Sequence, residues 1–147
     1  MSRRSAVCLL LLALLPVPHP AQAQEGESYV VIVNASNGVR ELSQDLVARM
    51  FLRKTRSWAG GPAVVPVDHS LVSPLRGAFS RRVLGLSVGE VRDYWMKQTL
   101  SGGELAPTIR SSEREIVEFV KAEQGAIAYV TAGTTLPADV KAVKVTQ

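Results

Sequence analysis

The sequence predicts an α/β fold with a largely parallel sheet flanked by helices. Apolar, β-branched runs of strand length alternate with segments of helical periodicity, which is the order typical of such a fold. Several of these runs are apolar on both faces, as expected of strands that helices cover on each side. Four strands are expected, at 29–34, 63–67, 126–130 and 140–145.

The helices are predicted by their start signals as much as by their apolar stripes. They are expected over 44–53, 74–84, 88–98 and 113–124. Each follows a serine that can cap it: Ser43, Ser73, Ser87 and Ser112. Pro74 stands at the first helical position, where its missing N–H costs nothing. Gly85 is a suitable residue to end the helix that begins there.

Residues 1–23 have the pattern of a secretory signal peptide with cleavage after Ala23. A basic start is followed by an apolar run over 6–15 and by the small residues "AQA" at 21–23. The run is about ten residues long, whereas about twenty are needed to cross a bilayer, so no membrane span is expected. Cleavage leaves 24–147 as one domain, periplasmic or secreted. The single cysteine, Cys8, leaves with the signal, so the domain has no disulfide.

Charge and composition exclude several classes of protein. The chain has 17 Lys and Arg against 13 Asp and Glu, and loss of Arg3 and Arg4 with the signal leaves 15 against 13, a net charge of +2. This mildly basic balance does not predict a nucleic-acid partner, which needs a concentrated basic face. His69 is the only histidine in 24–147, so neither a zinc site nor any other metal site is expected. Asp68, His69 and Ser70 are adjacent in the chain, whereas a catalytic triad needs side chains that converge from separate elements. No catalytic residue, cofactor or enzymatic activity is therefore expected.

Five segments in a fixed order give the chain a resemblance to a known family. They read "LVARMFLRKTRSWAGG", "VVPVD", "R-x-AF" followed by "VLG", then "YW" and "QGAIAYV". This order resembles the substrate-binding proteins of phosphate ABC importers, in particular their short, single-lobe members, over Tyr29 to Val145. The resemblance implies a single three-layer lobe of the type II periplasmic binding fold. It also implies a non-enzymatic protein that binds phosphate or a similar small oxyanion and has an ABC permease as its partner.

The candidate ligand-binding residues follow the second predicted strand. In the family, the loop corresponding to 68–76 is a glycine-rich Ser/Thr segment, and the resemblance assigns Ser70, Ser73 and Arg76 to the ligand. Ser36 and Asn37, in the loop after the first strand, are added as candidates from the residues of that loop and not from the resemblance. Here the loop reads "HSLVSPL", with Leu, Val and Pro in place of glycines. From the residues alone the plainer interpretation is that Ser73 only caps a helix and Arg76 is solvated.

A second function is therefore kept open. The lobe fold could persist in a ligand-free protein-interaction module of the cell envelope, a role that the missing glycines favour. One lobe leaves an anion open to water, where each donor contributes little, so monomer affinity is expected to be about millimolar. Whether two copies pair as a homodimer to rebuild a two-lobed cleft is left open by the sequence.

Overall fold

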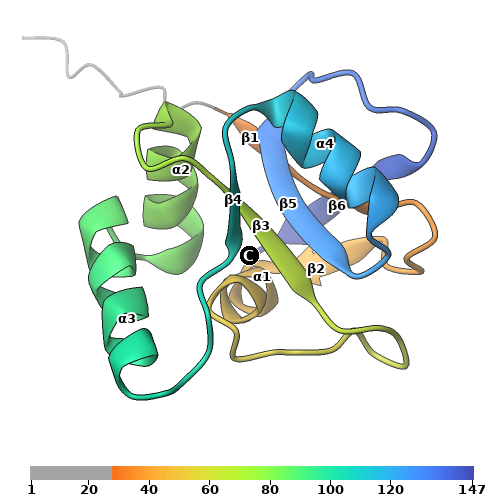
Figure 1. Ribbon diagram of the computed structural model, residues 1–147. Helices are drawn as coiled ribbons and strands as arrows, with labels where there is room; N and C mark the ends of the chain where they lie inside the picture. Colours follow the sequence, from red (N-terminus) through yellow and green to blue (C-terminus); the bar gives the residue numbers. More distant parts are fainter. Residues whose placement is uncertain (1–27) are drawn as a thin grey trace, which may run out of the picture.

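A computed structural model describes residues 28–147. The predicted signal peptide and its cleavage site lie outside the described residues. Residues 28–147 form one six-stranded sheet with helices on both faces (Figure 1). The strands are β1 (Tyr29–Asn34), β2 (Glu41–Ser43), β3 (Val65–His69), β4 (Thr108–Arg110), β5 (Ala126–Thr131) and β6 (Val140–Thr146). The helices are α1 (Gln44–Phe51), α2 (Pro74–Phe79), the π-helical η1 (Ser80–Leu84), α3 (Val88–Leu100) and α4 (Glu113–Ala122).

The strand order is β2-β6-β1-β5-β3-β4. Strand β1 is antiparallel to both of its neighbours, β5 and β6, whereas the other three pairings are parallel. Five strands therefore point one way and β1 alone points the other. The predicted mostly parallel sheet is confirmed, with its first strand as the exception.

The side chains of β1 show how the sheet is covered. Val31 and Val33 belong to a core that α1, α2 and η1 cover, whereas Ile32 belongs to a second core beneath α4. This alternation follows from the twofold period of a strand. Figure 1 shows α4 on one side of the sheet and α1 and α2 on the other, while α3 packs beside η1. The expected three-layer lobe is confirmed.

Most predicted boundaries agree with the structure, and the differences have physical reasons. Strands β2 and β4 lie in segments that were expected to be loops, because three residues are too few to show a period. The predicted second strand is found two residues further along, at Val65–His69. The predicted helix 74–84 is divided into α2 and η1, and it ends as expected at Gly85, in the left-handed conformation with φ of 66°.

The expected N-caps are all present. Ser43, Ser73, Ser87 and Ser112 each accept a hydrogen bond from a backbone N–H of the helix that follows. Ser87 and Glu90 form a complete capping box. At the start of α4, Ser112 accepts from the Glu115 N–H, but the Glu115 carboxylate accepts from the Ser111 N–H at 3.0 Å and not from that of Ser112, so only half of a capping box is formed there.

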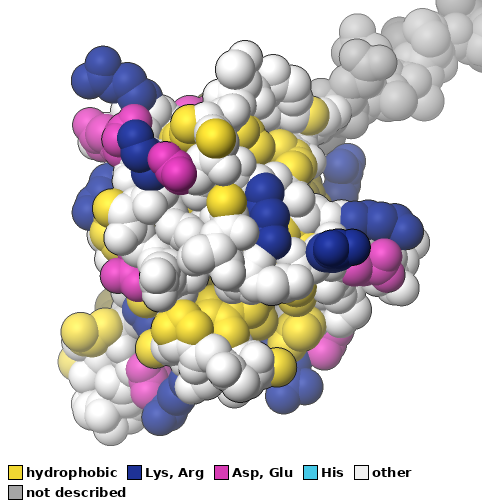
Figure 2. Space-filling model, turned by 90° about the vertical axis from the view of Figure 1, so that its right-hand side faces the viewer, with side chains coloured by type: hydrophobic (Ala, Val, Ile, Leu, Met, Phe, Trp, Pro, Cys, Tyr) yellow, Lys and Arg dark blue, Asp and Glu magenta, His cyan; other side chains and the backbone are white. Residues whose placement is uncertain are grey.

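Charged side chains of both signs are mixed on one face of the molecule. On the face drawn in Figure 2, Lys and Arg lie among Asp and Glu, with apolar side chains between them. Lys144 and Glu41 form an exposed ion pair, with 3.3 Å between Nζ and Oε2. Within residues 28–147, no helix combines the length and the apolar character needed to cross a membrane.

Candidate functional site

The topology has a switch point at the carboxyl ends of β3 and β5. These strands are parallel neighbours, yet the chain leaves β3 toward β4 and leaves β5 toward β6, on opposite sides. In open α/β sheets, ligands bind at such a switch point. This edge, which we call the crevice, lies between the loops 70–73 and 131–139 at the upper end of the sheet in Figure 1.

The loop 70–73 holds two of the predicted site residues. Ser73 lies at the N-cap of α2, where its hydroxyl accepts from the Arg76 N–H at 3.4 Å, and its own N–H donates to the Ser70 carbonyl at 3.1 Å. A capping hydroxyl accepts with its oxygen, so its proton remains free for another acceptor. Between the two serines, Leu71 is 51% exposed and Val72 is 90% exposed. Ser70 and Ser73 therefore stand together at the crevice, beside exposed apolar side chains.

Arg76 is buried, not solvated. Its guanidinium is 3.1 Å from the Asp68 carboxylate and donates to the His69 carbonyl at 2.7 Å. Arg76 and Asp68 are 4% and 6% exposed. The charge lies directly beneath the loop, because the carbonyl that it binds immediately precedes Ser70. Solvated Arg76 was the plainer expectation from the sequence, and burial with a counterion corrects it.

A buried polar cluster surrounds this ion pair. The Tyr129 hydroxyl donates to the Asp68 carboxylate, which also accepts the backbone N–H of His69 at 2.8 Å. The ring Nε2 of His69 lies 2.8 Å from the Tyr129 carbonyl and therefore carries the ring proton. Burial, and then the charge of Asp68, raise the pKa of Tyr129 far above its ordinary value, so the phenol stays neutral.

This cluster explains why Asp68, His69 and Ser70 do not act as a triad. The Asp68 carboxylate is engaged by Arg76, Tyr129 and a backbone N–H, while the His69 ring donates to a carbonyl. A triad would need the carboxylate on the histidine ring and that ring on the serine. The roles seen here are structural: they fix the end of β3 beneath the loop.

Glu113 is a crevice residue that the sequence did not single out. It is the first residue of α4, and its carboxylate accepts from the N–H of Thr131 at 2.8 Å and from the hydroxyls of Thr131 and Thr134 at 2.5 and 2.9 Å. Burial alone would raise the pKa of Glu113, but these hydrogen bonds, helped by nearby His69, lower it. The carboxylate is therefore ionised at neutral pH. A Glu in the first turn of a helix is common because it complements the helix dipole, so the sequence gives no signal of a further role for Glu113.

Ser36 and Asn37 lie at the opposite end of the sheet. Ser36 donates to the Asn34 side chain at 2.6 Å, and Asn37 accepts from the Val39 N–H at 3.0 Å. Because β1 is antiparallel to β5, and β5 is parallel to β3, the loop after β1 cannot meet the loop after β3. The structure thus separates Ser36 and Asn37 from Ser70, Ser73 and Arg76, and the two groups cannot share one small ligand.

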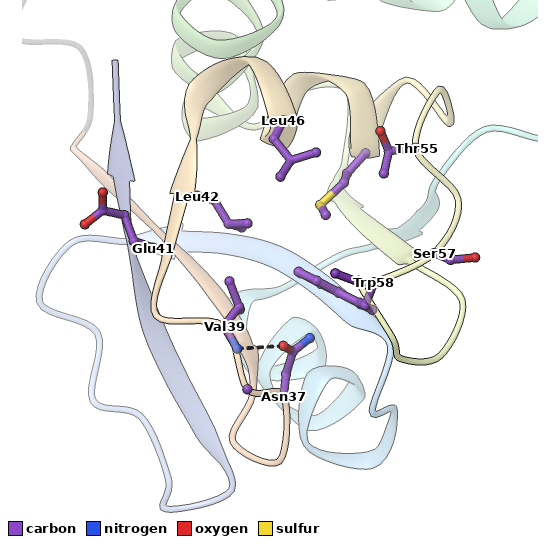
Figure 3. Close-up of a pocket in the computed structure, with 11 residues that line it drawn as sticks. Asn37, Val39, Glu41, Leu42, Leu46, Thr55, Ser57 and Trp58 are labelled. Carbon is purple, nitrogen blue, oxygen red and sulfur yellow. Dashed lines mark hydrogen bonds between the residues drawn. The ribbon is translucent and has the colours of Figure 1, made fainter.

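A mostly apolar cavity of about 540 Å³ opens at that same opposite end, between α1 and the loops 35–40 and 52–64. In Figure 3 the side chains of Val39, Leu42, Leu46 and Trp58 point toward its centre, whereas Glu41 and Ser57 point away. Trp58 is 7% exposed, belongs to the core beneath α1 and donates to the Gly125 carbonyl, so its role is one of packing. No three His, Cys, Asp or Glu side chains gather to hold a metal ion anywhere in 28–147.

Comparison with known proteins finds similarity in structure. One similar structure is a protein from Clostridium perfringens, described as a candidate phosphate ABC transporter substrate-binding protein and solved with bound phosphate. The superposition has a TM-score of 0.64 and 22% sequence identity, and it covers 81% of this chain and 45% of that one. An ABC-type phosphate transport receptor from Vibrio cholerae gives 0.63 and 15%, covering 81% and 46%. PstS from Borrelia burgdorferi gives 0.63 and 11%, covering 82% and 48%.

These similarities are confined to the fold. No protein-family model matches the sequence, and no curated protein matches it significantly. The chain spans less than half the length of the solved structures described above. They show that residues 28–147 have the fold of a single lobe of a periplasmic binding protein.

Proposed function

We propose that the protein is a non-enzymatic, extracytoplasmic solute-binding lobe that holds phosphate or a similar small oxyanion at the crevice between β3 and β5. The observation that carries the proposal is the position of Ser70 and Ser73: both stand at the carboxyl end of β3, in a fold that a structure with bound phosphate shares. The link to ABC-type uptake rests on the same solved structures and is part of the proposal.

The residues of the loop supply the chemistry that an oxyanion needs. The hydroxyls of Ser70 and Ser73 are short donors that can reach an anion without a large change in the backbone. Arg76 adds a buried positive charge behind them, although Asp68 neutralises much of it. An anion here would be bound by the neutral serine hydroxyls, with the ion pair of Arg76 and Asp68 behind them. Ser36 and Asn37 are left out because they lie at the other end of the sheet.

A single lobe leaves one side of the anion in water. Exposed donors contribute little each, so a monomer is expected to bind with about millimolar affinity. Tighter binding needs a second surface over the crevice, supplied by another protein or by a second copy of this chain.

A second candidate function is supported by the exposed apolar residues of the same loop. Leu71 and Val72 present 51% and 90% of their surface to solvent at the crevice. Exposed apolar side chains of this kind suit contact with a protein partner, as in a ligand-free interaction module of the cell envelope.

The test is thermal unfolding with millimolar phosphate, sulfate or chloride at equal ionic strength, because binding to the native state alone raises the midpoint. The variants are Ser73→Ala and, as its control, Ser87→Ala, since each removes one N-cap at a cost of about 1 kcal/mol. The proposal predicts that phosphate raises the midpoint of the unmodified protein and of Ser87→Ala, but much less that of Ser73→Ala. Equal responses in both variants would refute the assignment of Ser73. The absence of any phosphate response would favour the interaction module.

A further inference from the structure

We infer that Glu113 is a specificity-determining residue of the crevice, whose carboxylate competes with a bound anion for the donors of the loop 131–134. This inference rests on the proposed function, since it concerns the same crevice. The Glu113 carboxylate would thereby limit the affinity of the chain for oxyanions.

The first argument is how completely the Glu113 carboxylate is held. One oxygen accepts from the N–H and the hydroxyl of Thr131, at 2.8 and 2.5 Å, and the other accepts from the hydroxyl of Thr134 at 2.9 Å. A backbone N–H and two hydroxyls are donors of the kind that hold a small oxyanion in a protein. The donors of the loop after β5 are therefore already engaged by a carboxylate of the protein itself.

The second argument is position. Thr131 is the last residue of β5, and His69 is the last residue of β3, so both mark the edge at which the crevice opens. Helix α4 packs against both strands and brings Glu113, its first residue, to that edge. The negative charge of Glu113 therefore lies at the same edge of the sheet as the loops 70–73 and 131–134.

The third argument is the effect on an incoming anion. The Glu113 carboxylate occupies donors that phosphate would otherwise use, and its charge repels phosphate at short range, where the interaction is weakly screened. Binding at the crevice must therefore either displace Glu113 from Thr131 and Thr134 or use the donors of the loop 70–73 alone. Both routes weaken the affinity of the native chain for phosphate relative to a chain without this charge.

The test compares Glu113→Gln with Glu115→Gln in the protein expressed from the full sequence, using calorimetric titration with inorganic phosphate. Gln has the shape of Glu without its charge, so the side-chain amide can remain near Thr131 and Thr134. Glu115 is the matched control: it lies in the same helical turn, and its carboxylate accepts from the Ser111 N–H. We expect E113Q to bind phosphate at least about tenfold more tightly than the native protein, and E115Q to change the affinity less than about threefold, because only Glu113 holds the shared donors.

A second variant, Glu113→Ala, removes the side chain and leaves its three donors without their partner. Millimolar acetate should then raise the thermal midpoint of E113A and leave that of the native protein unchanged, because the small carboxylate takes the vacated place. This rescue separates the inference from a purely structural role for Glu113, which would lower stability without creating an acetate response. If E113A does not fold, the comparison of E113Q with E115Q decides.

The outcomes distinguish this inference from the proposed function. Phosphate binding of equal strength in the native protein, E113Q and E115Q would overturn the inference and leave the proposed function standing. Binding by E113Q alone would support the inference and refute phosphate binding by the native chain. No binding by any of the three, with no acetate response in E113A, would overturn both.

Discussion

The buried pair of Asp68 and Arg76 makes the most specific prediction about stability. We expect Asp68→Asn to lower the free energy of unfolding by about 3–5 kcal/mol, the range observed when one partner of a buried ion pair is removed. The reason lies in the contacts of Asp68, which accepts from Arg76, Tyr129 and the His69 N–H. Asparagine keeps one acceptor oxygen but leaves the guanidinium of Arg76, a residue that is 4% exposed, without a counter-charge.

The assay is urea unfolding followed by circular dichroism, with a double-mutant cycle that adds Arg76→Met. The double variant D68N/R76M leaves no unpaired buried charge, so it should cost less than the sum of the single variants by at least about 2 kcal/mol. Asp93→Asn is the control, because its pair with Arg92 is exposed and should contribute less than about 1 kcal/mol. If D68N costs no more than D93N, or if the cycle is additive, the account of this cluster is refuted.

Two further predictions concern other parts of the structure. Gly125→Ala should destabilise the protein by about 2 kcal/mol or more, because a Cβ at Gly125 would lie 2.0 Å from the Ala63 carbonyl oxygen. Gly38→Ala is the control: a Cβ there would have nothing within 4 Å, so stability should change by less than about 0.5 kcal/mol. Equal losses of stability in urea unfolding would contradict the packing described. Glu113 has a pKa below its ordinary value of 4.5, so its contribution to stability is present above that value and is lost as the pH falls through the lower, folded-state pKa. Acid unfolding curves should therefore fall more steeply for the native protein than for E113Q below about pH 4.5, and parallel curves would count against the hydrogen bonds assigned to Glu113.

Much of the fold could be predicted because local and tertiary signals agree. The apolar run 29–34 became β1 with the predicted bounds, and the serines at 43, 73, 87 and 112 each begin a helix as expected. The direction of β1 could not be predicted. Pairing between the first strand and the last two depends on contacts far apart in the sequence, which no local pattern reports.

The candidate site was predicted only in part. The loop holding Ser70 and Ser73 was located, because the polar loop and the helix start stand next to each other in the sequence. The partner of Arg76 was missed, although a sequence signal for it existed: Asp68 directly follows the apolar run 63–67, and a carboxylate in a buried strand needs a positive partner. Glu113 could not have been found, since its role depends on Thr131 and Thr134, some twenty residues away.

The central claim is that the crevice between β3 and β5 binds an oxyanion. The most direct measurement is a series of ¹H–¹⁵N correlation spectra of the protein titrated with phosphate, with chloride at equal ionic strength as the control. The account predicts saturable shifts of the amides in 69–76 and 131–134, and none in 36–38 or 55–59. Shifts confined to the apolar cavity at the other end of the sheet, or no saturable shift at all, would contradict it.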